Sequence, residues 1–114
     1  MLFAKKSMRM YTLEYFEQDS IPSGLVFVGV EWCRFCRDLK PTWTDLYQCA
    51  VQHGLPTAVG AVDAEAIPEI KALLDIETFP TILVISDNNI QHYTGPRNLE
   101  ALIDLLNDAL HLKE

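Results

Sequence analysis

The sequence has little of several features that would point to particular classes of protein. Basic residues are few: nine Lys and Arg stand against sixteen Asp and Glu, which gives a formal net charge of −7 in 114 residues. Nucleic-acid binding needs clustered Lys and Arg against the phosphates, so this balance argues against such a partner. Long apolar runs are also missing, since residues 25–30 fall far short of the roughly 20 that span a bilayer. We therefore expect neither a nucleic-acid nor a membrane partner.

The N-terminus has no apolar core of the kind found in a secretory signal. Lys5, Lys6 and Arg9 interrupt the first ten residues, where a signal peptide would need a continuous apolar stretch. We therefore expect a cytoplasmic protein. We also expect a monomer. The chain has only three cysteines, and a permanent disulfide would be unusual in a reducing compartment. A close pair of cysteines is then expected to serve catalysis or metal binding.

The pattern of apolar and turn residues predicts a single domain over residues 1–114, with residues 1–20 the hardest to interpret. The apolar run 25–30 predicts a strand buried on both faces, and residues 57–62 predict another. Apolar side chains at helical spacing predict a helix over 33–53 that contains Pro41. The remaining predictions are a short strand or helix in 11–16, a helix over 67–75, strands 81–85 and 90–93 joined around 87–89, and a last helix capped by Asn98. This order predicts an α/β fold, with a central mixed β-sheet flanked by helices on both faces.

The stretch Trp32-Cys33-Arg34-Phe35-Cys36 places two cysteines three positions apart. A zinc site is one candidate function, because Cys49 and His53 follow at a spacing similar to that of zinc fingers. On a continuous helix, however, Cys49 would lie roughly 20 Å from Cys36, whereas zinc ligands converge within about 2.3 Å of the ion. We therefore expect no metal. A permanent structural disulfide is also disfavoured, because so small a loop removes little entropy from the unfolded chain.

A redox function agrees best with the surroundings of the pair. A buried strand that leads into a helix places Cys33 at the helix N-terminus, where free N–H groups and the helix dipole favour a thiolate. Both effects lower the pKa of Cys33 from its free value of about 8.5. Cys36 lies one turn further in and is expected to be more sheltered. Cys33 would attack a disulfide of the substrate, and Cys36 would then resolve the mixed disulfide.

Five motifs in the right order resemble the thioredoxin superfamily, in particular thioredoxin and protein disulfide isomerase-like domains. The resemblance covers nearly the whole chain after residue 20. The motifs are Trp32-Cys33-x-x-Cys36, Pro41 inside the following helix, Val62-Asp63-Ala64, Phe79-Pro80-Thr81 and Tyr93-Thr94-Gly95-Pro96-Arg97. The resemblance implies the thioredoxin fold.

The same resemblance implies a thiol–disulfide oxidoreductase that acts on protein disulfides and takes part in electron transport. A reductase or glutathione would supply the electrons, and no cofactor is expected. Cys33 and Cys36 would form the redox-active disulfide. The Phe79–Pro80 bond would be cis, and Trp32, Phe79, Pro80 and Gly95 would bind the substrate.

The sequence departs from the family in the strand before the cysteines. Phe27 stands where the family commonly keeps a buried Asp or Glu that helps to move the proton of the resolving thiol. Val59 stands where thioredoxins commonly have a partner lysine. Deprotonation of Cys36 is therefore expected to rely on water or on Arg97 swinging in. Mixed disulfides should then resolve slowly near neutral pH.

The two residues between the cysteines also modulate the site. The cation of Arg34 beside Cys33 is expected to stabilise the thiolate and hence the reduced form. This predicts a reduction potential less negative than the roughly −270 mV of thioredoxin. Phe35 is expected either to join Trp32 and Phe79 in an apolar surface for the partner or to pack on its own helix.

A second function from another class stays open. The chain would then be a non-catalytic binding module or adaptor that holds a partner on Trp32, Phe79 and Pro80. The other candidates for chemistry are expected to be unremarkable in function. Cys49 should be an inert residue at the edge of the core, and His53, His92 and His111 should lie at the surface.

Overall fold

The computed structural model describes residues 8–112, which form a five-stranded sheet and four helices. The strands are β1 (Arg9–Met10), β2 (Gly24–Gly29), β3 (Val59–Asp63), β4 (Thr81–Ser86) and β5 (Asn89–Tyr93). The helices are α1 (Leu13–Phe16), α2 (Arg34–Gln52), α3 (Ile70–Leu73) and α4 (Leu99–Ala109). Within these residues no helix is both long enough and apolar enough to cross a bilayer.

Strand β2 lies at the centre of the sheet, whose strand order is β1-β3-β2-β4-β5. It runs parallel to β3 and antiparallel to β4, with Phe27 opposite Ala61 on one side and Ile82 on the other. The sheet is therefore mixed, as predicted. Every residue of β2 is buried, because both edges are paired and both faces are covered. The run at 25–30 was thus correctly predicted as a buried strand, although the strand itself ends at Gly29.

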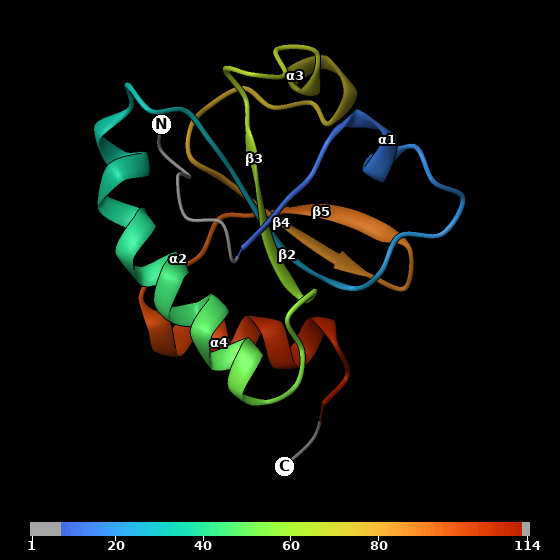
Figure 1. The fold of residues 1–114 in the computed structure, drawn as a ribbon, viewed down its shortest axis with the longest axis vertical. Helices are drawn as coiled ribbons and strands as arrows, with labels where there is room; N and C mark the ends of the chain where they lie inside the picture. The colour runs from blue at the N-terminus through green and yellow to red at the C-terminus, as the bar shows by residue number, and fades with distance from the viewer. Residues whose placement is uncertain (1–7, 113–114) are drawn as a thin grey trace.

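The helices cover both faces of the sheet, which confirms the predicted architecture. In Figure 1, α2 and α4 lie together on one side of the strands, while α1 and α3 lie on the other. The interior between these layers holds the apolar side chains of the sheet and of α2 and α4.

Helix α2 carries the two cysteines and agrees with its predicted bounds within a residue at each end. Cys33 is its N-cap and His53 its C-cap, and Pro41 lies inside it. The predicted apolar stripe is buried along its length, at Leu39, Trp43, Leu46, Tyr47 and Ala50. The Trp43 indole N–H donates to the Gly60 carbonyl of β3 at 3.0 Å. This bond fixes α2 directly on the sheet.

The last helix was also predicted correctly. The Asn98 side chain accepts a hydrogen bond from the Ala101 N–H at 2.9 Å, as an N-cap residue does. Leu102 and Leu106, both members of the predicted apolar face, are buried.

The predicted helix over 67–75 is wrong in length. The structure has only Ile70–Leu73 as α3. Pro68 has no N–H to continue a helical ladder, and the Ile67 N–H instead bonds back to the Asp63 carbonyl at 3.2 Å in a turn. Asp75, with a φ of 55°, ends the segment. The strand predicted from residue 57 likewise begins only at Val59.

The turn between β4 and β5 is tighter than predicted. It consists of Asp87 and Asn88, with φ values of 53° and 67°, and Asn89 already belongs to β5. Two successive positive φ values are typical of the two-residue turns that match the twist of a β-hairpin. In the N-terminal region the structure has a helix, α1, where the sequence left a strand or a helix open.

Candidate active site at the start of α2

The two cysteines lie at the end of the sheet where β2 passes into α2. Cys33 is the extended N-cap residue of α2 and is half-buried. Cys36 lies in the first helical turn and is fully buried. Both thiols are free in this structure. One sulfur is therefore accessible to a partner, while the other is reached only through it.

The loop that carries Pro80 lies against Cys33. Thr81, the first residue of β4, pairs with Val28 near the end of β2, so the two connecting loops emerge at the same edge of the sheet. The Phe79–Pro80 bond is cis, as predicted. The Cys33 thiol donates to the Phe79 carbonyl oxygen at 3.5 Å. The backbone before Pro80 is thus in contact with the more accessible sulfur.

Three aromatic residues lie next to the cysteines or to Pro80 in the sequence, and we call Trp32, Phe35 and Phe79 the aromatic rim. Trp32 is 65% exposed and Phe35 is 62% exposed. The Trp32 and Phe79 rings meet edge to face, with centroids 6.1 Å apart. The Lys71 ammonium lies 5.9 Å from the centre of the Phe79 ring. Apolar surface of this size beside a free thiol suits an extended partner segment.

The surroundings of Cys33 favour its thiolate. Partial burial acts to raise its pKa, but hydrogen bonds from the Cys36 N–H, the Cys36 thiol and the Phe35 N–H outweigh it, together with the positive charge of Arg37. The net result is a pKa of Cys33 below the ordinary value. Arg37, which the sequence analysis missed, thus contributes positive charge that lowers this pKa, and an effect of Arg34 stays a prediction. Arg37 lies four residues after Cys33, and this one-turn spacing was a signal that could have identified it.

Arg37 is held in place by the loop in front of the helix. Its guanidinium donates to the Glu31 carbonyl oxygen at 3.0 Å. Arg34 and Arg37 are both exposed. Holding the cation on the backbone of the active-site loop keeps its charge near the N-terminus of α2.

Burial raises the pKa of the Cys36 thiol to about 12, and the neighbouring Cys33 contributes in the same direction. The Val30 backbone and the charge of Arg97 oppose this shift. The Arg97 guanidinium donates to the Pro80 carbonyl oxygen at 3.5 Å, so it stands at the edge of the site, and its swing toward Cys36 stays a prediction. The two thiols consequently differ strongly in acidity.

The floor beneath Cys36 is formed by β2. A Cβ built on Gly29 would lie 2.7 Å from the Phe27 ring and 3.1 Å from the Cys36 sulfur. Ring and sulfur therefore crowd the same piece of backbone. The Phe27 ring also meets Trp43 edge to face, with centroids 5.6 Å apart. The sequence analysis noted Phe27 but missed Gly29, whose lack of a side chain makes room for both groups.

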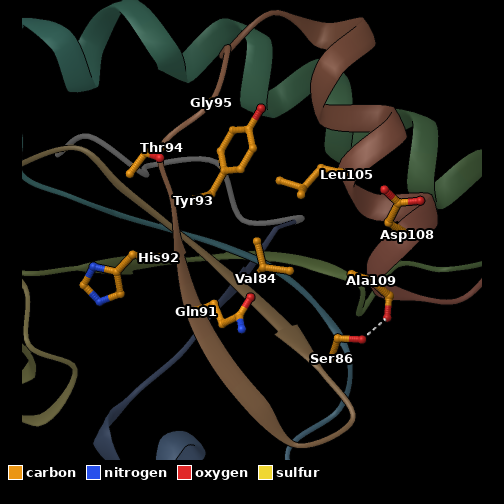
Figure 2. A pocket seen from close by; sticks show the side chains of 10 residues that line it. All are labelled: Val84, Ser86, Gln91, His92, Tyr93, Thr94, Gly95, Leu105, Asp108 and Ala109. Carbon is orange, nitrogen blue, oxygen red and sulfur yellow. Dashed lines mark hydrogen bonds between the residues drawn. The ribbon is translucent and has the colours of Figure 1, made fainter.

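Gly95, predicted to bind substrate, packs against its own loop. A Cβ there would lie 2.5 Å from the Tyr93 hydroxyl, which donates to the Pro96 carbonyl at 2.7 Å. Figure 2 shows Gly95 at one end of a groove of about 450 Å³ between β5 and α4, with Ser86 bonded to Ala109 at the other end. A contact between Gly95 and substrate stays a prediction.

The remaining cysteine lies in a different place. Cys49 is half-buried further along α2 and lines a cavity of about 140 Å³ with His53. Because α2 is continuous from Arg34 to Gln52, Cys49 cannot approach the Cys33–Cys36 pair. Among residues 8–112 no group of three or more His, Cys, Asp or Glu converges as metal ligands would. All three histidines lie at the surface, as predicted.

The fold and the paired thiols define a thioredoxin-type domain. The sequence profile of the family described as Thioredoxin matches residues 10–108. Protein disulfide-isomerase TMX3 of Xenopus laevis is 30% identical over 83 residues, which cover 73% of this chain and 18% of that protein. Protein disulfide-isomerase of Zea mays is 33% identical over 89 residues, covering 75% and 17%. The chain thus spans less than a fifth of the length of either relative.

A solved structure shows the same fold. The first thioredoxin domain of mouse Protein disulfide-isomerase A4 superposes with a TM-score of 0.73 and 17% identity, over 90% of this chain and 74% of that one. The chain belongs to the thioredoxin family. Its domain is homologous to those of protein disulfide isomerases and retains a Cys-x-x-Cys pair.

Proposed function

We propose that this chain is a thiol–disulfide oxidoreductase that reduces or exchanges disulfides of protein substrates. The observation that carries the proposal is the difference between the two sulfur atoms. Cys33 has a lowered pKa, and its sulfur touches the backbone next to the cis-proline. Cys36 stands one turn further on, fully buried and with a pKa raised to about 12. This is the arrangement that a nucleophile and a resolving thiol require.

In the first step the Cys33 thiolate attacks one sulfur of the substrate disulfide. A bond forms between the Cys33 sulfur and that sulfur, and the other substrate sulfur leaves as a thiolate that takes a proton from solvent. The aromatic rim would bind the apolar side chains that flank the substrate cysteine, with Pro80 beside the Cys33 sulfur. No cofactor is required, because the electrons pass between sulfur atoms.

In the second step Cys36 loses its proton and attacks the Cys33 sulfur. The Cys33–Cys36 disulfide forms, the bond between Cys33 and the substrate breaks, and the reduced substrate leaves. The pair is oxidised by two electrons, and the substrate disulfide is reduced by the same two. A reductase or glutathione would return the pair to the dithiol. Arg97 would assist by drawing the Cys36 thiol toward ionisation through its positive charge.

Insulin provides a direct test, because reduction of its interchain disulfides makes one chain precipitate. The protein should accelerate precipitation in the presence of dithiothreitol. Cys33→Ser should abolish the acceleration and Cys36→Ser should reduce it strongly, whereas Cys49→Ser, the matched control, should retain it. No acceleration by the unmodified protein, or equal loss in the Cys49→Ser variant, would refute the proposal.

A second candidate function, a binding module without catalysis, is favoured by the exposure of the aromatic rim. Trp32 and Phe35 remain more than half exposed, which is a large apolar surface for so small a domain. A Cys33→Ser, Cys36→Ser double variant separates the two functions. If it captures the same partners as a Cys36→Ser variant and with equal yield under reducing conditions, the thiols are not needed. If capture requires Cys33 and is reversed by reductant, the oxidoreductase is supported.

A further inference from the structure

Two residues of β2, Phe27 and Gly29, lie below the Cys36 sulfur. Residues 27 and 29 are two apart on one strand, so their side chains point to the same face of the sheet. That face carries α2, because the Phe27 ring meets Trp43 of α2 at 5.6 Å. At position 29 there is no side chain. The Phe27 ring occupies the free space instead, beside the Cys36 sulfur.

The ring makes the surroundings of Cys36 apolar on the sheet side. Phe27 and Cys36 are both 0% exposed, and Trp43, two turns further along α2, is also 0% exposed and meets the ring edge to face. The charged groups that act on the Cys36 thiol are Cys33 and Arg97, neither of which belongs to β2. From β2 the thiol meets a phenyl ring and a glycine, neither of which can accept a proton.

We propose that the Phe27 ring, seated over Gly29, is a positioning element that delays the second exchange step and makes the chain a covalent holder of its partners. This inference rests on the proposed function, because it concerns the lifetime of the mixed disulfide that Cys33 forms. A thiol becomes a nucleophile only after it loses its proton, and a phenyl ring neither takes the proton nor admits water to take it. The partner then stays bound through the Cys33 sulfur until Cys36 ionises and attacks that sulfur or an external thiolate attacks the mixed disulfide.

Two reactions can cleave the mixed disulfide between Cys33 and its partner. In the internal route, hydroxide takes the Cys36 proton, the Cys36 sulfur bonds to the Cys33 sulfur, and the partner leaves as a thiolate that solvent protonates. In the external route, a thiolate such as that of glutathione attacks the partner sulfur, forms a new mixed disulfide with it, and leaves Cys33 as a thiolate. The inference assigns the ring an effect on the internal route alone.

The experiment uses the chain in a Cys49→Ser background and a synthetic peptide whose single cysteine is joined to 5-thio-2-nitrobenzoate. Attack of Cys33 on the peptide sulfur releases coloured thionitrobenzoate and leaves the peptide on Cys33, so the absorbance burst reports the first step. Mass spectrometry of acid-quenched samples then follows the decay of the protein–peptide adduct, which reports the second step. Far-UV circular dichroism verifies that each variant is folded.

Phe27→Asp places a carboxylate beneath Cys36, and Phe27→Asn places a group of the same size that is not a base. Positioned bases contribute on the order of a hundredfold or more to a proton-transfer step, so a decay at least about tenfold faster in Phe27→Asp at neutral pH is expected. Phe27→Asn should decay at a rate nearer that of the unmodified chain. Equal decay rates in folded Phe27→Asp and the unmodified chain would overturn the inference, as would equal acceleration by Asp and Asn.

The pH profile of the unmodified chain tests the inference without any substitution, should Phe27→Asp fail to fold. Adduct decay should rise about tenfold per pH unit up to at least about pH 9, as expected when a thiol with a strongly raised pKa must first ionise. A plateau below pH 8 would overturn the inference. A missing burst and a missing adduct in the unmodified chain would refute the proposed function itself, so the two failures are distinguishable.

Discussion

At the level of single residues, the acidities of the two thiols differ because their surroundings differ, although only two residues separate them. Cys33 receives hydrogen bonds from Cys36 and Phe35 and feels the charge of Arg37. Cys36 lies wholly inside the protein against β2. A lowered pKa gives a larger thiolate fraction at every pH below the ordinary value, and a raised pKa gives a smaller one. The signs of the two shifts therefore support the proposed roles, attack by Cys33 and resolution by Cys36.

The first prediction concerns alkylation of the reduced protein by iodoacetamide. Because only thiolates react, Cys33 should be modified at a pH below that at which a free cysteine reacts. Cys36 should stay unmodified until the pH approaches its pKa of about 12. Peptide mass spectrometry across a pH series assigns each modification to its residue. Similar rates for Cys33 and Cys36 at neutral pH would contradict the assignment.

The second prediction concerns the reduction potential. A cation that stabilises the Cys33 thiolate favours the reduced form, so equilibration with glutathione buffers should give a value less negative than about −270 mV. Arg37→Ala should make the potential more negative. Arg34→Ala, three positions earlier on the same helix, is the matched control and should change the potential less. A larger change in the reduction potential of Arg34→Ala than of Arg37→Ala would show that Arg34 is the cation that stabilises the thiolate.

At the level of elements, the site depends on how β2, α2 and the loop before β4 are joined. Antiparallel pairing of β2 with β4 brings the Pro80 loop to the cysteines. The bond from Trp43 to Gly60 fixes α2 on β3. The β4–β5 turn is linked to the chain before β2, because the Asn88 side chain accepts from the Ile21 N–H at 2.8 Å and donates to the Asp19 carbonyl at 2.9 Å.

The third prediction tests the Trp43 bond. Trp43→Phe removes the buried indole donor, leaves part of its volume empty, and should lower the free energy of unfolding by about 2 kcal/mol. Trp32→Phe makes the same chemical change at a residue that is 65% exposed, and should change stability by less than about 0.5 kcal/mol. Urea denaturation measures both. Equal stability losses would show that burial of the indole is not what matters.

The fourth prediction separates two functions of Asn88. Asn88→Ala removes both side-chain hydrogen bonds and places a Cβ-bearing residue without them at a φ of 67°, at an expected cost of about 2 kcal/mol. Asn88→Gly removes the same bonds but tolerates the positive φ, so it should be more stable than Asn88→Ala by about 1 kcal/mol. Thermal unfolding of both variants checks the order. The reverse order would contradict the role given to backbone conformation.

The sequence predicted a helix or strand correctly wherever the signal came from residues close together in the chain. The spacing of Leu39, Trp43 and Leu46 predicted α2, and the Asn98 cap predicted the start of α4, because both depend on nearby residues alone. The predicted length of α3 was wrong because the Ile67 N–H bonds to the Asp63 carbonyl in a turn and Pro68 has no N–H to donate, neither of which helical spacing reports. The contact between Phe27, Gly29 and Cys36 joins two elements and becomes visible only in three dimensions.

At the level of the whole molecule, the mixed sheet with helices on both faces and the membership of the thioredoxin family are established. Motifs far apart in the sequence predicted the family. In the structure the residues of these motifs, Cys33, Cys36 and Pro80, meet at one edge of the sheet. The structure describes residues 8–112, and a single domain over 1–114 stays a prediction. So do the cytoplasmic location, the monomeric state and the identity of the electron donor. None of these is encoded in the packing of the domain.

The central claim is that Cys33 and Cys36 form one reversible redox pair, and a disulfide map tests it most directly. The reduced protein is treated with oxidised glutathione, quenched with acid, alkylated and digested for peptide mass spectrometry. We expect a Cys33–Cys36 disulfide that dithiothreitol removes, with Cys49 recovered as the alkylated thiol. Recovery of Cys33 and Cys36 as unreacted thiols, or a disulfide that involves Cys49 in place of either, would contradict the account.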